Sequence, residues 1–293
     1  MEKITFTCEI VTPVFMYGAE GSDGTPEFRP SSVKGAMRFW WRAANGALGL
    51  SEMKTKEGKL FGIVGDDKTS SRSSFSIQIS EMPEESVPTK RIHYKDFGKN
   101  NKALSSKQTF SISLRSDTKE TLDKAADVFV LSCLLGGFGG RSRRGFGSIT
   151  IKEKNGQTYM MPTTIDKVLE LLYQVSGNEF KLATDDSIIP MRTPSGSYPF
   201  IKQIQLGHAT KSQVTDKVAD AAHETKKNNA TTYDASLGYA KGRKRFASPV
   251  YTSVIEAEHG QTRPIITTLH AQPEAGDGWP NTAVQEQFKN KIL

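Results

Sequence analysis

Cysteine and histidine are scarce in this chain of 293 residues, which holds two cysteines and five histidines. Cys8 and Cys133 lie far apart, each among apolar or small residues, so we expect buried free thiols and neither a disulfide framework nor a zinc site. The histidines are scattered, and none has the spacing of a metal-ligand pair. The sequence therefore predicts no metal and no cofactor.

Long apolar runs are also missing. No stretch approaches the roughly 20 apolar residues that a membrane-spanning helix needs, and the first residues, Met1 to Ile4, do not resemble a signal peptide. We therefore expect a cytoplasmic protein without a membrane partner. Lys and Arg number 39 against 32 Asp and Glu, a net charge of +7, and this excess favours an anionic partner such as nucleic acid.

Residues typical of a catalytic centre are few. The adjacent acidic pairs Asp66-Asp67 and Asp185-Asp186 lie among polar residues and are interpreted as solvated loops. His93, in the segment 91–95, is the remaining candidate for acid-base chemistry on RNA. The sequence therefore favours a protein that is not an enzyme.

Apolar residues alternate at a period of two in several short segments and recur at helical spacing in others. Strands are predicted at 4–10, 75–79, 108–114 and 148–152, with helices from Ser31 to Leu48 and from Asp117 or Thr118 to Leu135. This order is βαββαβ, the ferredoxin-like unit. Residues 52–74 are a polar stretch, and 81–107 has the character of an insertion.

The second half of the chain is less regular. Helices are predicted at 165–175, 213–229 and 282–292, and strands at 199–206, 247–257 and 262–270. This order fits a degenerate second copy of the same unit. The predicted fold is α+β, with two ferredoxin-like (RRM-like) domains packed together, at 1–160 and 161–293.

A glycine-rich loop (residues 136–147) contains six glycines and three arginines among its twelve residues. Unobstructed backbone amides beside positive charge are a composition suited to phosphate. The stretch 140–145 has the glycine spacing of a nucleoside triphosphate loop, but Phe146 and Gly147 stand where Lys and Ser or Thr are needed. A dinucleotide loop would follow a strand and begin a helix, whereas this loop follows a helix. The alternative is a flexible connection whose arginines face solvent.

The first predicted helix carries Lys34, Arg38 and Arg42 at intervals of four residues, so three cations share one side. No Asp or Glu lies between Arg29 and Arg42, and a bound polyanion would offset their repulsion. The alternative is a solvated basic face that receives carboxylates from elsewhere in the fold. A third basic group, at 241–245, precedes Phe246 and could follow a nucleic-acid backbone or bind a partner subunit.

Three segments carry a resemblance to a known family: Thr12 to Gly18, Pro26 to Arg42, and the glycine-rich loop. They resemble the RAMP superfamily of CRISPR proteins, and the first two are most similar to the first subunit of the type III-B Cmr complex. The resemblance extends to Phe246–Val250 and the strands that follow. It implies two ferredoxin-like domains and membership of an assembly that carries CRISPR guide RNA and captures complementary single-stranded target RNA, near the 3′ part of the guide.

Together these observations predict a non-catalytic RNA-binding subunit that contacts phosphates, guide RNA, target RNA and other Cmr subunits. Its expected RNA-binding residues are Lys34, Arg38, Arg42, Gly139, Gly140, Arg141, Ser142, Arg143, Arg144, Arg243, Lys244 and Arg245. Two alternatives stay open. One is a metal-independent CRISPR RNA-processing endoribonuclease that uses His93, and the other is a structural cap subunit with little RNA contact.

Overall fold

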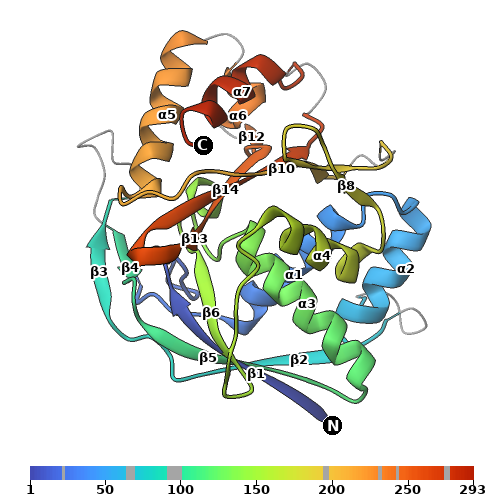
Figure 1. Ribbon diagram of the computed structural model, residues 1–293. Coiled ribbons are helices and arrows are strands. Elements are labelled where there is room, and N and C mark those ends of the chain that lie inside the picture. Colours follow the sequence, from blue (N-terminus) through green and yellow to red (C-terminus); the bar gives the residue numbers. More distant parts are fainter. Residues whose placement is uncertain are drawn as a thin grey trace.

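A computed structural model of the chain (Figure 1) describes residues 1–21, 24–63, 70–90, 101–193, 198–229, 233–241, 244–273 and 278–293. Two five-stranded antiparallel sheets and the helices packed against them form most of the molecule. Each half of the chain supplies one sheet.

The first half contains the predicted βαββαβ order. Its elements are β1 (Glu2–Ile10), α1 (Pro30–Ala44), α2 (Leu50–Phe61), β2 (Phe75–Ser80), β3 (Ser86–Thr89), β4 (Asn101–Leu104), β5 (Thr109–Ser116), α3 (Lys119–Leu135), β6 (Ile149–Lys154) and β7 (Gln157–Thr158). The sheet order is β2-β5-β1-β6-β7, with antiparallel neighbours. The ferredoxin-like unit is thus confirmed, with α2 and the β3–β4 hairpin added to it.

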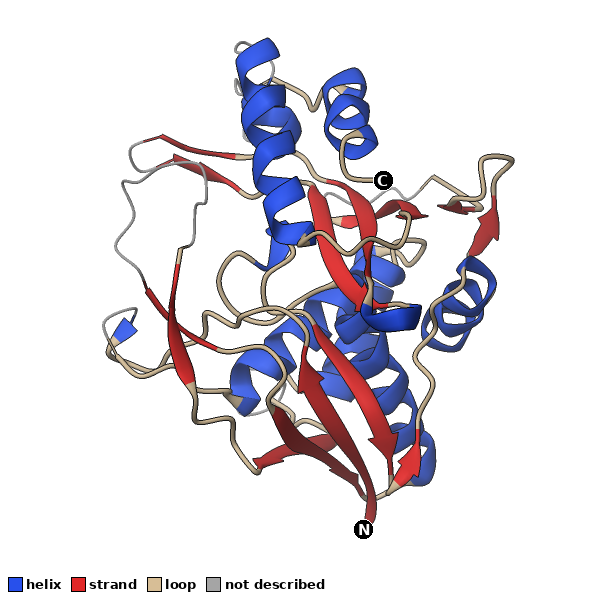
Figure 2. Ribbon diagram, turned by 60° about the vertical axis from the view of Figure 1, so that its left-hand side comes forward, coloured by secondary structure: helices blue, strands red, loops and turns tan. Residues whose placement is uncertain are grey.

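Strand β1 lies at the centre of this sheet because it pairs with β5 on one edge and β6 on the other, and burial alternates along it. Ile4, Phe6, Cys8 and Ile10 are buried on one face, and the residues between them are partly exposed. The helices cover that face (Figure 2), and the Phe6 ring lies 5.1 Å from the ring of Phe129 on α3. Burial raises the pKa of the Cys8 thiol above its ordinary range, and Cys8 and Cys133 are both free and buried, as expected.

The second half forms its own sheet. Its elements are α4 (Ile165–Ser176), β8 (Phe180–Leu182), β9 (Ile188–Pro190), β10 (Phe200–Leu206), α5 (Val214–Asn228), α6 (Tyr233–Leu237), β11 (Tyr239–Lys241), β12 (Lys244–Phe246), β13 (Val250–Glu256), β14 (Thr262–His270) and α7 (Thr282–Asn290). The sheet order is β13-β14-β10-β9-β8. The order β10-α5-β13-β14-α7 follows the predicted elements, while the β8–β9 hairpin, which precedes β10 in the chain, lies beside it. That this half is a degenerate second copy stays a prediction.

Strand β13 joins the two halves. Tyr251 packs edge-on against Trp40 of α1, with 5.0 Å between ring centroids, and Ser253 Oγ donates to the carbonyl of Leu134. The main core includes residues of both halves. The proposed boundary between residues 160 and 161 therefore stays a prediction.

Two polar stretches hold elements that the sequence did not predict. Helix α2 (Leu50–Phe61) overlaps the first part of 52–74, and Met53, Leu60 and Phe61 give it an apolar side. The β3–β4 hairpin lies within 81–107, at the periphery of the molecule in Figure 1. Among the described residues, no helix is both long and apolar enough to cross a membrane.

Candidate nucleic-acid interface

The glycine-rich loop is tied to the segment before α1 by backbone contacts. The Gly140 amide donates to the carbonyl of Phe15 at 2.6 Å, so at least this amide is already used within the protein. Gly147 has a φ of +72°, and a Cβ there would lie 2.0 Å from the carbonyl oxygen of Phe138. Both the positive φ and the close approach require glycine. Part of the glycine content thus serves the fold of the loop itself.

Arg143 fixes this loop to the second half of the chain. Its guanidinium donates to the carbonyl of Ser248 and lies over two rings, 4.4 Å from Tyr251 and 5.7 Å from Phe39. Burial lowers the pKa of Arg143, against an opposing effect of Tyr251. A cation placed over aromatic faces is stabilised by their quadrupoles. Arg143 therefore positions the loop instead of reaching freely into solvent.

Arg144 also points toward the second half. Its guanidinium donates to the carbonyl of Leu237 at 2.8 Å and lies 5.2 Å from the ring of Phe288. Arg141, in contrast, is exposed and has a φ of +63°, in the left-handed region. Gly139 and Gly140 are exposed beside it. Among the predicted loop residues, Gly139, Gly140 and Arg141 are exposed, and Ser142, Arg143 and Arg144 are partly buried.

The loop and the β11–β12 hairpin share one cleft of about 470 Å³. Arg141 to Arg144 line one side of it, and Tyr239, Phe246 and Ser248 line the other. Lys244 and Arg245 are exposed on β12, whereas Arg243 lies outside the described residues. The structure thus brings the second and third predicted basic groups together.

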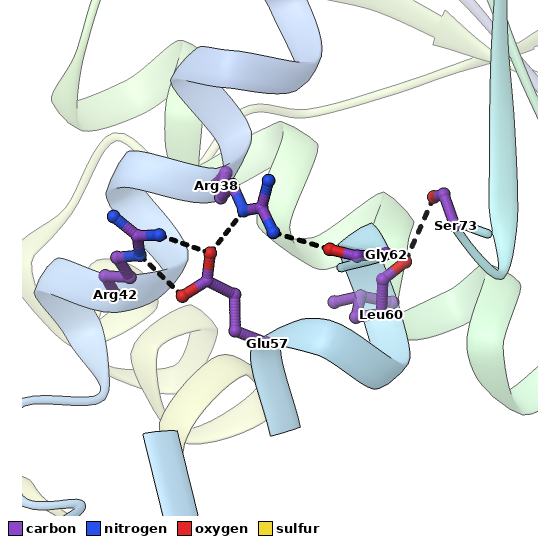
Figure 3. A network of polar contacts seen from close by, with 6 residues as sticks. All are labelled: Arg38, Arg42, Glu57, Leu60, Gly62 and Ser73. Carbon is purple, nitrogen blue, oxygen red and sulfur yellow. Dashed lines mark hydrogen bonds and ion pairs between the residues drawn. The ribbon is translucent and has the colours of Figure 1, made fainter. Parts of the chain in front are cut away.

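The α1 side chains Arg38 and Arg42 point toward Glu57 of α2 (Figure 3). Glu57 of α2 lies between the two arginines: it accepts from Arg38 and, through both its oxygens, from Arg42 at 2.5 and 2.6 Å. Arg38 also donates to the carbonyl of Gly62 at 2.6 Å. The expectation that a bound polyanion offsets the repulsion is thus corrected, because a carboxylate from a neighbouring helix already does so.

Glu57 is a charge-neutralising centre that sequence reasoning missed. Only 6% of its side chain is exposed. Burial raises the pKa of its carboxyl, but the hydrogen bonds from Arg42 and Arg38 outweigh that effect, and the pKa lies below its ordinary value. A buried carboxylate is stable when it is paired and hydrogen-bonded in this way. The residues Arg38, Arg42 and Glu57 are named the Glu57 cluster below.

Lys34 contacts strand β2. Its ammonium donates to the carbonyl of Phe75 at 3.2 Å and lies 4.8 Å from the Phe75 ring. Burial and the nearby Arg38 lower its pKa. One residue beyond Arg38, Phe39 contacts Arg143 instead. The α1 cations and the loop arginines therefore use different sides of the same helix.

The exposed segment 139–141 nevertheless lies beside the start of α1. Phe15 accepts from Gly140, and the next residue, Met16, contacts the backbone amides of Glu27 and Arg29. Helix α1 begins at Pro30 with no acidic residue in its first turn. A helix amino terminus carries partial positive charge. The loop that carries Arg141 and the amino-terminal end of α1 therefore both adjoin the segment that contains Phe15 and Met16.

The sequence offered two acidic pairs and His93 as candidates for metal binding or acid-base chemistry. Asp185 accepts from the backbone amide and the hydroxyl of Ser187, at 3.1 and 2.6 Å, and so closes a turn. Asp66, Asp67 and His93 lie outside the described residues. Within the described part of the chain, no group of three or more His, Cys, Asp or Glu residues could hold a metal ion.

Comparison with known proteins agrees with this architecture. Residues 7–150 match the RAMP superfamily. The chain is 30% identical over 185 residues to the CRISPR system Cmr subunit Cmr1-2 of Pyrococcus furiosus, covering 52% of this chain and 96% of that protein. This chain belongs to the RAMP superfamily of CRISPR proteins.

Solved structures show the same fold over nearly the whole chain. The crystal structure of Cmr1 from Pyrococcus furiosus in its apo form superposes with a TM-score of 0.64 at 18% identity, covering 100% of this chain and 96% of that one. A chain in the cryo-EM structure of the type III-B Cmr-beta complex bound to cognate target RNA gives 0.64 at 12% identity, with 99% of each covered. The sequence indicated a likeness to the first subunit of the type III-B Cmr complex, and the relative and the fold together confirm it.

Proposed function

We propose that this chain is a non-catalytic RNA-binding subunit of a type III-B Cmr effector complex. It holds guide and target RNA through phosphate contacts near the 3′ end of the guide, in antiviral defence, beside other Cmr subunits. The relative named Cmr1-2 and the RNA-bound Cmr-beta structure support the assembly. The base sequence is recognised by pairing with the guide, and the protein contributes backbone contacts.

One observation carries the RNA contact. The exposed segment 139–141, with the cation of Arg141, lies beside the start of α1, whose first turn has no acidic residue. Backbone amides, a helix end and a guanidinium are the groups that bind phosphate oxygens. Lys244 and Arg245 are exposed on β12, in the hairpin whose Tyr239 and Phe246 line the cleft.

The Glu57 cluster plays a smaller part in this proposal. Arg38 and Arg42 already share a carboxylate, so a phosphate would have to compete with it. Their replacement would also leave Glu57 buried without partners, and any loss of RNA binding would then be mixed with a loss of stability. Arg141 gives a cleaner test of the interface.

The test is the salt dependence of single-stranded RNA binding by Arg141→Ala. Each phosphate contact on a single strand contributes about 0.7 to the slope of log K against log salt, so we expect weaker binding and a slope reduced by about that amount. Lys119→Ala is the matched control. It removes one cation at the opposite end of α3, about 25 Å from the loop at 1.5 Å per helical residue.

Two results would contradict the proposal. Equal affinity and slope for wild type and Arg141→Ala would favour a cap subunit with little RNA contact. Specific cleavage of a labelled CRISPR repeat RNA, lost in His93→Ala, would favour the endoribonuclease. The proposal is supported if the RNA stays intact and the slope of log K against log salt is smaller for Arg141→Ala than for wild type.

A further inference from the structure

Three aromatic rings form a cluster at the surface of the second half. Phe200 of β10 and His270 of β14 lie nearly parallel, with 4.6 Å between centroids and 13° between planes. Trp279 lies 6.4 Å from His270 and is tilted by 40° to its plane, so it adjoins the stacked pair without lying parallel to it. Phe200 is 3% exposed, whereas Trp279 is 64% exposed. The cluster therefore runs from the core to solvent and ends in an exposed indole.

Exposure distinguishes Trp279 from the other two tryptophans of the chain. Trp40 and Trp41 are 1% and 7% exposed. A tryptophan left in water forgoes the large apolar burial that its side chain could supply. Such a residue is expected where a ligand covers it. An exposed indole offers a flat surface for a planar group.

The backbone next to Trp279 is fixed. Two residues further on, the Asn281 amide donates to Ser236 Oγ at 2.9 Å, and the Asn281 side chain caps α7 by accepting from Ala283 and Val284. A capped helix start and a tertiary hydrogen bond limit how far the segment can move. The indole is thus presented in a defined place, which lowers the entropy cost of stacking on it.

Two sets of contacts connect the chain around this cluster to the candidate interface. Ser236, which holds Asn281, precedes Leu237, whose carbonyl accepts from Arg144. On the other side, the Leu269 amide donates to the carbonyl of Pro249, next to the Ser248 carbonyl that Arg143 contacts. Residues that neighbour the cluster in the chain therefore lie next to Leu237 and Ser248, which line the arginine-lined cleft.

The surroundings of His270 favour the neutral form of its imidazole. Burial lowers the pKa of His270, and the nearby Lys202 lowers it further. A neutral imidazole stacks on Phe200 without bringing a second charge next to Lys202. Lys202 itself is exposed.

We propose that Trp279, supported by His270 and Phe200, is a stacking platform for an unpaired base of the RNA bound along the arginine-lined cleft. The inference rests on the proposed function and adds a contact to the base plane, which no phosphate contact supplies. Single-stranded RNA is commonly held by a basic groove together with aromatic side chains, and the stacking tolerates any base because each has a π face. The platform thus adds affinity without reading sequence.

The test uses the full chain and a short, unstructured single-stranded RNA. Because Trp40 and Trp41 are buried, long-wavelength tryptophan emission reports on Trp279. We expect RNA to quench this emission in wild type and to leave the emission of Trp279→Phe nearly unchanged. Trp279→Ala should weaken RNA binding roughly tenfold, the size of one base stack. Met160→Ala, at a residue that is 79% exposed, is the control and should bind as wild type does.

An abasic scan of the RNA separates stacking from charge. An RNA with one abasic position should bind wild type about as weakly as intact RNA binds Trp279→Ala. Removing the same base should not lower the affinity of Trp279→Ala any further. If RNA binds but neither quenching nor an abasic effect occurs, the platform is wrong while the proposed function stands. If Trp279→Ala impairs association with other subunits alone, the site is a protein contact and the inference fails. If wild type binds no RNA, both proposals fail.

Discussion

The Glu57 cluster and the glycine-rich loop both concentrate arginine, yet they hold it in opposite ways. In the Glu57 cluster, two guanidiniums share one carboxylate that is nearly inaccessible to solvent. In the loop, Arg143 contacts a carbonyl and two rings, which are neutral. The first arrangement neutralises charge inside the fold, and the second keeps a positive charge near a cleft. Arginine content alone therefore does not locate a phosphate site.

The largest expected effect is on the Glu57 cluster. Glu57→Ala leaves two guanidiniums close together without their shared carboxylate. Breaking a buried pair costs at least about 3 kcal/mol of unfolding free energy, and the partial exposure of Arg38 and Arg42, at 38% and 47%, reduces the expected loss to about 2 to 3 kcal/mol. Denaturant unfolding would measure this loss. The control is Glu52→Ala, which removes an exposed ion pair with Lys56 and should change stability by less than about 0.5 kcal/mol. Equal stability of the two variants would contradict a structural role for the cluster.

The next effect concerns the loop. Gly147→Ala places a Cβ at 2.0 Å from the Phe138 carbonyl and also forces a residue with a side chain to a φ of +72°. We expect a loss of about 2 kcal/mol or more. Gly156→Ala is matched in φ, at +75°, but a Cβ there meets nothing within 4 Å. It should cost about 1 kcal/mol from backbone strain alone. A loss no greater at Gly147 would show that the loop relaxes freely.

The smallest expected effect is a pH dependence. The pKa of Glu57 is lowered from an ordinary value of 4.5, so its ionised form stabilises the folded state above that value. This stabilisation is lost as the pH falls through the lower, folded-state pKa. The stability advantage of wild type over Glu57→Gln should therefore be full near neutral pH and shrink in acid.

A carboxyl with the opposite shift provides the control. Burial raises the pKa of Asp127, so wild type should lose stability relative to Asp127→Asn as the pH rises above the unfolded value of 3.8. Urea unfolding of both variants over a pH series would measure the two trends. The same trend in both would contradict the assigned environments.

Much of the fold could be predicted because it depends on local spacing. The alternation in β1 and the helical spacing in α3 each repeat within a few residues, and these elements lie where they were expected. Helix α2 was missed because its apolar side is narrow: of its twelve residues, Met53, Leu60 and Phe61 are the buried apolar ones. The division at residues 160 and 161 stays a prediction, since the main core includes both halves.

The candidate site was predictable only in part. Composition singled out the glycine-rich loop, and the structure shows an exposed Arg141 on it. Arg38 and Arg42 receive a carboxylate from another helix, Glu57 of α2, which is the alternative that the sequence left open. Trp279 was not predicted as a site residue, because a single tryptophan in a polar segment belongs to no periodic pattern. Whether the twelve predicted residues bind RNA stays a prediction.

The sequence by itself determined the positive charge, the free thiols, the βαββαβ order of the first half without α2 and the β3–β4 hairpin, and the place of the glycine-rich loop. These follow from counts and from contacts between near neighbours in the chain. Only the tertiary structure decided which cations are neutralised, which position the loop and which remain accessible. Those outcomes depend on segments far apart in sequence, such as Arg143 and Ser248, meeting in space, and no local pattern contains that information.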